Sequence, residues 1–284
     1  MKKNKFDLNF LGIGAQRCGT TWISQCLAEH PQICISHPKE VSFFGTMKFR
    51  FGLSWYKKHF SPKSNQILGE FNAGYHTSNE AAHQIKTLFP DIKIIISLRN
   101  PINRVFSNYL SVASFEARNQ SFETWLYKNQ KMIDRGLYYT HLKKYFELFP
   151  KKNILIVLYE DIAKNPVLFM EKIFRFLGVN PNFIPKSAIY KKNYSKSYKF
   201  PFVKRIIGKI VRFFDSFKFG VTLINLFRKI GGKKIFFFLD KINSQSLKKY
   251  PSMSKSTQKK LAFIYQPEID KLQKLIDCDL SAWK

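Results

Sequence analysis

The stretch Gly12-Ile-Gly-Ala-Gln-Arg-Cys-Gly-Thr-Thr-Trp22 decides the fold class of this chain. An apolar run at residues 9–13 leads into it, and apolar side chains at helical spacing follow in residues 20–29, so the pattern predicts a strand, a glycine loop and a helix. Such a loop directs backbone N–H groups and the positive end of a helix dipole at one point, which makes an anion site. Thr20 stands where the Walker pattern has lysine, and the cation of the stretch is Arg17 instead.

Strands and helices alternate through the first 180 residues. Further strands are predicted at 33–35, 67–71, 92–98 and 154–158, and further helices at 78–88, 102–110, 138–149 and 166–177. This alternation predicts an α/β fold with a P-loop-like central parallel β-sheet flanked by helices. After Pro181 the strand pattern ends, and we expect a basic helical C-terminal region that closes with helices at 254–264 and 267–276.

The charge of the chain is strongly positive and unevenly distributed. The net charge is +29, and residues 186–260 hold 20 of the 48 basic residues but only two of the 19 acidic ones. Anionic partners are therefore expected. Within residues 201–250 apolar and basic side chains interleave, which suits either an amphipathic insertion facing an anionic membrane or helices that cap the core with lysines toward water. No motif for specific nucleic acid binding accompanies them.

Cysteine spacing and apolar run lengths exclude several classes of protein. The four cysteines form no Cys-x-x-Cys pair and no histidine lies at zinc-ligand spacing, so neither a metal site nor a disulfide framework is expected. The apolar runs fall short of the roughly 20 residues that span a bilayer. We interpret the first residues as an uncleaved amino terminus and expect a cytoplasmic protein, with the inner face of the membrane as the alternative location.

A second candidate phosphate motif lies in residues 97–109. Arg99 follows a predicted buried strand, and Ser107 lies eight residues further along in the following helix. That spacing across a turn can bring a guanidinium and a hydroxyl to one phosphate, a group that arginine recognises with two parallel hydrogen bonds. Two such sites at neighbouring strand ends indicate a ligand with phosphates at two separated positions.

Together these motifs resemble those of sulfotransferases that use 3′-phosphoadenosine 5′-phosphosulfate (PAPS). Residues 16–22 are similar to the loop for the 5′-phosphosulfate, and residues 97–109 to the motif for the 3′-phosphate. Further co-linear motifs resemble bacterial members related to the heparan-sulfate-type and protein-tyrosine enzymes: His30-Pro31, Lys39-Glu-Val-Ser-Phe-Phe44, Gly69-Glu70, Arg135-Gly-Leu-Tyr138, Leu158-Tyr-Glu-Asp-Ile162, Phe176-Leu-Gly-Val179 and Asp279-Leu-Ser-Ala-Trp283.

The resemblance implies how the donor would be bound. Arg17 would contact the 5′-phosphosulfate and stabilise the departing phosphate, while Arg99 and Ser107 would hold the 3′-phosphate. Contacts around the 5′ end are implied for the rest of the loop, which is Cys18, Gly19, Thr20, Thr21 and Trp22. The indole would lie against the adenine, although a position in the core is the alternative for it.

The catalytic base is expected among the acidic residues near the loop. Sulfuryl transfer is an in-line displacement, so the acceptor hydroxyl or amine must lose a proton as it attacks. Glu40 occupies the place of the glutamate base in the heparan-sulfate and tyrosyl enzymes, and His37 is its rival. A solvated ion pair with Lys39 is the structural alternative for Glu40. We expect Glu70 to orient the substrate or Arg17, or to serve the fold alone.

Two positions depart from the resemblance. Arg17 replaces the commoner lysine, which preserves the charge but changes the donor geometry. Phe71 stands where the heparan-sulfate-type enzymes carry a lysine, so the role of that lysine toward the substrate is in doubt here.

The sequence thus predicts a single sulfotransferase domain over residues 1–284. Residues 1–180 would form the α/β donor-binding core, and 181–284 a basic lid, at 191–196, and the helical C-terminal region. The predicted enzyme moves a sulfuryl group from PAPS to a hydroxyl, or less favourably an amine, of a carbohydrate or lipid-linked acceptor, with PAP as product and no metal. The alternatives are an atypical P-loop kinase and a non-enzymatic basic protein that docks on membranes or nucleic acid.

Overall fold

The computed structural model of the chain describes residues 6–113, 120–189, 196–198, 244–246 and 252–284. The chain separates into two compact units. The first comprises Met1–Val105, Lys131–Lys192 and Gln258–Lys284, and the second Phe106–Gln130 and Asn193–Thr257. The predicted lid and the amphipathic segment 201–250 lie outside the described residues, except for Lys196 and residues 244–246. Their roles, and the single-domain organisation, stay predictions.

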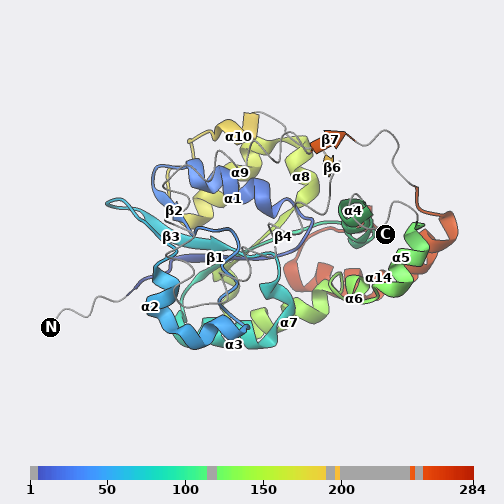
Figure 1. Ribbon diagram of the computed structural model, residues 1–284, viewed down its shortest axis with the longest axis horizontal. Helices are drawn as coiled ribbons and strands as arrows, with labels where there is room; N and C mark the ends of the chain where they lie inside the picture. Colours follow the sequence, from blue (N-terminus) through green and yellow to red (C-terminus); the bar gives the residue numbers. More distant parts are fainter. Residues whose placement is uncertain (1–5, 114–119, 190–195, 199–243, 247–251) are drawn as a thin grey trace. The chain divides into compact units, whose positions relative to one another are not determined.

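The first unit is built on a five-stranded parallel sheet with the order β2-β3-β1-β4-β5 (Figure 1). Its strands are β1 (Phe10–Gly14), β2 (Ile33–Ile35), β3 (Ile67–Phe71), β4 (Lys93–Leu98) and β5 (Ile154–Leu158). All five residues of β1 and the last five of β4 are buried, because helices cover both faces of the sheet and leave no polar face. The predicted α/β fold class is confirmed.

Helices flank this sheet on both faces (Figure 1). One layer contains α1 (Thr20–Glu29), α8 (Tyr159–Lys164), α9 (Pro166–Leu177) and α10 (Lys186–Ile189). The other contains α2 (Gly52–Lys57), α3 (Asn79–Leu88) and α7 (Tyr138–Leu148). The remaining described helices are α4 (Pro101–Ala113), α5 (Phe122–Lys128), α6 (Lys131–Asp134), α14 (Lys255–Ile276) and the 3₁₀ turns Met47–Phe51, Tyr75–Thr77, Lys151–Asn153 and Ser281–Trp283.

Local capping explains why several helices begin and end where the sequence predicts. The Asn165 side chain accepts hydrogen bonds from the backbone N–H groups of Val167 and Leu168, and Pro166 occupies the first turn of α9. Gly178 ends the same helix in the left-handed region, with φ of 78°. Ser78 caps α3 by accepting from the Ala81 N–H at 3.1 Å.

The prediction of two closing helices is wrong, because α14 is continuous and carries Pro267 within it. The proline removes one backbone donor, but the apolar stripe runs past it on one face. That stripe is buried at Leu261, Tyr265, Ile269 and Leu272.

Strands also occur beyond Pro181, where none is predicted. The second unit holds an antiparallel pair, β6 (Lys196–Tyr198) with β7 (Ser244–Ser246), and three-residue strands rich in serine give no hydrophobic alternation.

The packing between β1 and β3 requires glycine at position 69. Gly69→Ala is expected to lower the free energy of unfolding by about 1–3 kcal/mol, because the added Cβ would overlap the fully buried ring of Phe10. Urea unfolding measures this. Gly74→Ala is the matched control, since its Cβ would lie 3.5 Å from Asn72 Oδ1, an ordinary contact. Equal losses of stability in the two variants would contradict the packing argument.

Candidate active site

The candidate site lies at the carboxyl end of β1, where the strand order reverses. The chain builds β2 and β3 on one side of β1 and β4 and β5 on the other. In open parallel sheets, ligands bind at such a switch point. The Ala15 N–H donates to the Ser97 carbonyl at 2.8 Å, and the Ser97 hydroxyl donates to the Cys18 carbonyl at 2.6 Å. The loop is therefore attached to β4 at two points.

The backbone of the loop ends in a turn that only glycine adopts readily. Gly19 has φ of 77°, and a Cβ there would lie 2.9 Å from the Ile162 side chain. Gly19 is also the residue before α1, and no described side chain caps that helix. The first N–H groups of a helix lack intrahelical partners, so this end of α1 can bind an anion.

Two arginines meet at this end of the loop. Arg99 Nη1 donates to the Arg17 carbonyl at 3.4 Å, and the Arg99 guanidinium lies 4.5 Å from the centroid of the Tyr159 ring. Burial, followed by the positive charge of Arg99, lowers the pKa of Arg17. Arg17 also has φ of 72°, a left-handed conformation that is uncommon for a non-glycine residue. The predicted 5′ and 3′ cations are thus neighbours in space.

The other predicted residues of the loop differ in exposure. Cys18 and Thr20 are buried, and Thr21 is exposed. Burial raises the pKa of the Cys18 thiol to about 12, so the thiol is protonated at neutral pH. The Trp22 indole N–H donates to the Ser187 carbonyl at 2.8 Å, and its ring lies 5.8 Å from that of Phe169. Trp22 therefore packs toward α9 and α10, and its predicted contact with adenine stays a prediction.

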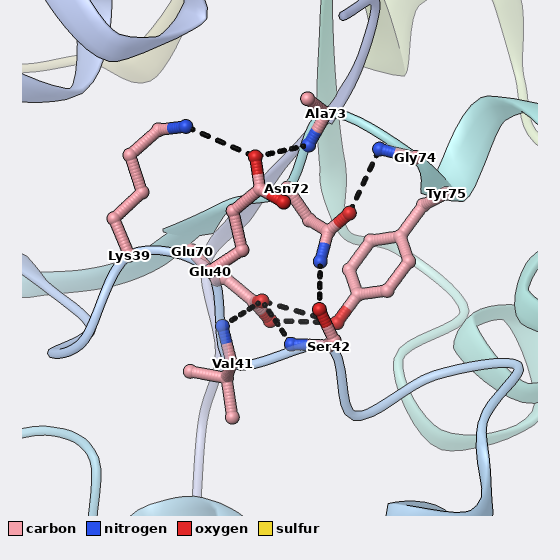
Figure 2. Close-up of polar contacts among 9 residues, drawn as sticks. All are labelled: Lys39, Glu40, Val41, Ser42, Glu70, Asn72, Ala73, Gly74 and Tyr75. Carbon is pink, nitrogen blue, oxygen red and sulfur yellow. Dashed lines mark hydrogen bonds and ion pairs between the residues drawn. The ribbon is translucent and has the colours of Figure 1, made fainter. Parts of the chain in front are cut away.

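Glu40 lies in the loop after β2, and its side chain contacts the segment that follows β3. Its Oε1 accepts hydrogen bonds from the Ala73 N–H and from Lys39 Nζ, each at 3.1 Å (Figure 2). The neighbouring Asn72 N–H donates to the Gly12 carbonyl at 2.7 Å, which attaches this segment to β1. Glu40 retains 34% of its side-chain exposure. The ion pair with Lys39 exists, and the Glu40 carboxylate also accepts a hydrogen bond from the backbone. Its role as the base stays a prediction.

His37 and Ser107 are two further predicted site residues. The side chain of His37 is exposed, and its backbone N–H donates to the His59 carbonyl at 2.8 Å. Ser107 lies on α4 and is partly exposed. The roles predicted for both stay predictions.

Glu70 is fully buried and bonds to the loop that carries Glu40. Its Oε1 accepts from the Val41 and Ser42 N–H groups at 3.0 and 3.2 Å (Figure 2). The next residue, Phe71, points to the other face of the sheet, where it joins the main hydrophobic core. Position 71 therefore serves packing in this chain, in contrast to the lysine of the heparan-sulfate-type enzymes.

Sequence reasoning missed the polar residues that surround Glu70. Tyr56 and Tyr75 donate their hydroxyls to it, and Asn72 Nδ2 donates to Ser42 Oγ at 3.0 Å. A polar asparagine and a tyrosine shortly after a predicted strand end were the available signal, because residues at the carboxyl ends of parallel strands meet at one edge. His76, buried against Gly14, was missed as well.

The described ranges contain neither a metal-ligand cluster nor a membrane-spanning helix. No group of three or more His, Cys, Asp or Glu side chains in them is arranged to hold a metal ion. No described helix combines the length and apolarity that a bilayer crossing requires.

The fold and the site define a P-loop-like α/β protein with two neighbouring arginines at the sheet's switch point. The family model described as "Sulfotransferase domain" matches residues 9–204, which is more than half of the chain. The chain belongs to this sulfotransferase family.

Curated proteins similar to this chain also carry the name sulfotransferase. It is 31% identical over 195 residues to human "Bifunctional heparan sulfate N-deacetylase/N-sulfotransferase 2", a match that covers 61% of this chain and 22% of that protein. Mouse "Bifunctional heparan sulfate N-deacetylase/N-sulfotransferase 4" is 30% identical over 202 residues, covering 63% and 23%. The chain thus spans less than a quarter of these relatives.

A solved structure shares the fold. A sulfotransferase from Alicyclobacillus acidocaldarius superposes with a TM-score of 0.68 at 23% identity and covers 98% of each chain. At this identity the likeness establishes the fold alone.

The buried imidazole beneath the loop makes stability depend on pH. Burial, followed by the charge of His141, lowers the pKa of His76 to about 3, whereas an unfolded histidine titrates near 6.5. Below about pH 6.5 the unfolded chain binds a proton that the folded chain does not, so stability falls as pH falls toward 3.

His76→Gln is expected to flatten this dependence in urea unfolding at pH 7, 6, 5 and 4. The matched control is His83→Gln, an exposed position on α3. An equally steep loss in wild type and His76→Gln would contradict the assignment.

Proposed function

We propose that this chain transfers a sulfuryl group from PAPS to a hydroxyl group of a carbohydrate or lipid-linked acceptor and releases PAP. Membership of the sulfotransferase family supports this class of reaction. The observation that carries the proposal is the approach of Arg17 and Arg99 to each other at the amino end of α1. Two neighbouring cations repel each other, and an anion of high charge offsets that repulsion.

The residues around the loop fit the donor. PAPS supplies an activated sulfuryl group whose bond to the 5′-phosphate breaks during transfer. Arg17 and the first N–H groups of α1 would bind the charge that develops on that phosphate. Arg99 would hold the 3′-phosphate, and the matching role of Ser107 rests on the sequence resemblance. Arginine and backbone donors suffice to stabilise this charge, so the proposed reaction needs no metal.

Glu40 would act as the general base. As the acceptor oxygen forms its bond to sulfur, the Glu40 carboxylate would take the hydroxyl proton and become neutral. The bond from sulfur to the 5′-phosphate oxygen breaks, and its electron pair leaves with PAP. Its partial exposure, and its attachment through Ala73 to the segment bonded to β1, support this role.

The proposed acceptor is a glycan. The similar human and mouse proteins are named heparan sulfate N-sulfotransferases, which supports a carbohydrate. The same names support an amine as the second candidate for the attacking group. Cytoplasmic location and contact with an anionic membrane stay predictions from the sequence.

Selective binding of adenosine 3′,5′-bisphosphate tests the donor assignment. We expect it to bind about 10- to 100-fold more tightly than AMP in calorimetry, because a charge-assisted hydrogen bond contributes about 1.5–3 kcal/mol. Arg99→Ala should abolish this preference, while Arg175→Ala, which removes an exposed arginine on α9, should leave it intact. Equal affinity for both nucleotides, with magnesium-dependent ATP turnover, would favour the kinase alternative.

Replacing the proposed base tests the mechanism. Glu40→Gln is expected to lower kcat by about 10²- to 10⁴-fold, because the amide cannot accept the acceptor's proton. Transfer of label from PAPS to a desulfated heparan sulfate acceptor measures kcat, and calorimetry checks that nucleotide affinity is unchanged. Glu147→Gln, at an exposed ion-paired carboxylate on α7, is the control. Full activity in Glu40→Gln would reject Glu40 as the base.

A further inference from the structure

Four consecutive backbone N–H groups after Glu40 converge on one carboxylate and one phenol. The N–H groups of Val41 and Ser42 donate to Glu70 Oε1 at 3.0 and 3.2 Å. The next two, from Phe43 and Phe44, donate to the Tyr75 hydroxyl oxygen at 2.8 and 3.4 Å. Residues 41–44 carry no regular secondary structure, so these bonds replace the ladder that a strand or helix would provide.

Glu70 and Tyr75 act as one unit. The Tyr75 hydroxyl accepts from the loop and donates its own proton to the carboxylate, 3.0 Å from Oε1 and 3.1 Å from Oε2 (Figure 2). The Tyr56 hydroxyl donates to Oε2 at 2.6 Å. The carboxylate thus accepts from two backbone and two phenolic donors. We call Glu70 and Tyr75 together the loop clamp.

The clamp is wholly inside the protein. Glu70 is 0% exposed and Tyr75 is 3% exposed. Burial raises the pKa of Glu70, and the hydrogen bonds from Tyr56, Tyr75 and the loop oppose that rise. A buried carboxyl group is costly unless its acceptors are satisfied, so the hydrogen bonds to both oxygens explain how the fold tolerates it.

The loop clamp is connected to Glu40 in two ways, through the backbone that it holds and through a side-chain hydrogen bond. Glu40 precedes Val41, the first clamped residue, and its side chain accepts from the Ala73 N–H between Glu70 and Tyr75 in sequence. Asn72 Nδ2 adds a hydrogen bond to Ser42 Oγ. Residues 70–75 therefore hold both the backbone after Glu40 and its carboxylate (Figure 2).

We propose that Glu70 is a positioning residue, which together with Tyr75 fixes residues 41–44 so that the Glu40 carboxylate is held toward the reacting atoms. This inference rests on the proposed function, in which Glu40 is the base. Glu70 does not contact the substrate, because it is fully buried. Its effect on the reaction passes through the placement of Glu40, and misplacement of a catalytic group by about 1 Å can reduce a rate about 100-fold.

Glu70→Gln is the first test, because it keeps the shape of the side chain but replaces one acceptor oxygen with a donor. We expect kcat for transfer from labelled PAPS to desulfated heparan sulfate to fall about 10- to 100-fold. Affinity for adenosine 3′,5′-bisphosphate should stay within about twofold of wild type, since the donor site is built on β1 and β4. Loss of affinity in proportion to kcat would overturn the proposal.

Tyr75→Phe is the second variant and keeps the test informative if Glu70→Gln does not fold. It removes the acceptor of two loop amides and leaves the carboxylate in place, so kcat should fall as in Glu70→Gln. Tyr56→Phe removes a donor that touches Glu70 but no loop amide, and its effect should be smaller. Tyr265→Phe, another buried tyrosine whose hydroxyl bonds the Ile133 carbonyl, should keep wild-type kcat.

A double-mutant cycle separates positioning from general stabilisation. In the Glu40→Gln background there is no base to place, so Glu70→Gln should change the residual rate less than about twofold. If the two losses multiply, Glu70 acts independently of Glu40 and the proposal is overturned.

Amide hydrogen exchange tests the clamp without any transfer reaction. Exchange at residues 41–44 should become at least about tenfold faster in Glu70→Gln and Tyr75→Phe, and should not change in Tyr265→Phe. If exchange at residues 41–44 is unchanged in Glu70→Gln and Tyr75→Phe, the clamp is refuted, but the proposed function is not. Absence of transfer by the wild-type protein, or full activity of Glu40→Gln, would instead refute the proposed function, so the two failures are distinguishable.

Discussion

The hydrogen bond from the Ala15 N–H to the Ser97 carbonyl joins the ends of β1 and β4, and the candidate site depends on it. The register between these strands shifts between Gly12 and Gly14, and pairing resumes with Gly14 opposite Ile96 before the chain turns into the loop. Ser97 is a polar residue in the otherwise apolar end of β4. Its place there is explained by the hydrogen bond that its hydroxyl donates to the Cys18 carbonyl. Arg99 follows two residues later and is thereby brought to Arg17.

Much of the fold could be predicted because its signals are local. The glycine loop, the apolar strands and the stop at Gly178 each depend on a few consecutive residues, and α9 has the predicted bounds. The proximity of Arg17 and Arg99 also has a sequence signal. Arg17 follows β1 and Arg99 follows β4, and these two parallel strands are adjacent in the sheet. The closing helix was misjudged because a proline is a local signal, whereas the buried stripe that keeps α14 continuous is a tertiary one.

The surroundings of Glu40 could not be predicted, because they are made by contacts distant in sequence. Val41 and Glu70 are 29 residues apart, and nothing in either segment alone states that one accepts from the other. Strand alternation requires Glu70 and Phe71 to point to opposite faces but does not say which faces the core. The surroundings of the Trp22 indole are equally hard to predict. The amphipathic pattern of a helix shows on which face a side chain lies but not which residues it contacts. In the structure the indole ring lies 5.8 Å from that of Phe169, and its N–H donates to the Ser187 carbonyl.

The distribution of charge agrees with the proposed function, in which the site binds an anion and holds a base. The carboxylate oxygens of Glu70 accept hydrogen bonds from phenols and backbone N–H groups, and not from a guanidinium. Had Glu70 been paired with either arginine, a buried carboxylate would compete with the donor's phosphates for the same guanidinium. Glu40 has Lys39 as its cation, at the solvent-facing side of the loop. In the proposed function Arg17 and Arg99 serve the ligand, whereas Glu70 needs no cation because the fold gives it neutral hydrogen-bond donors.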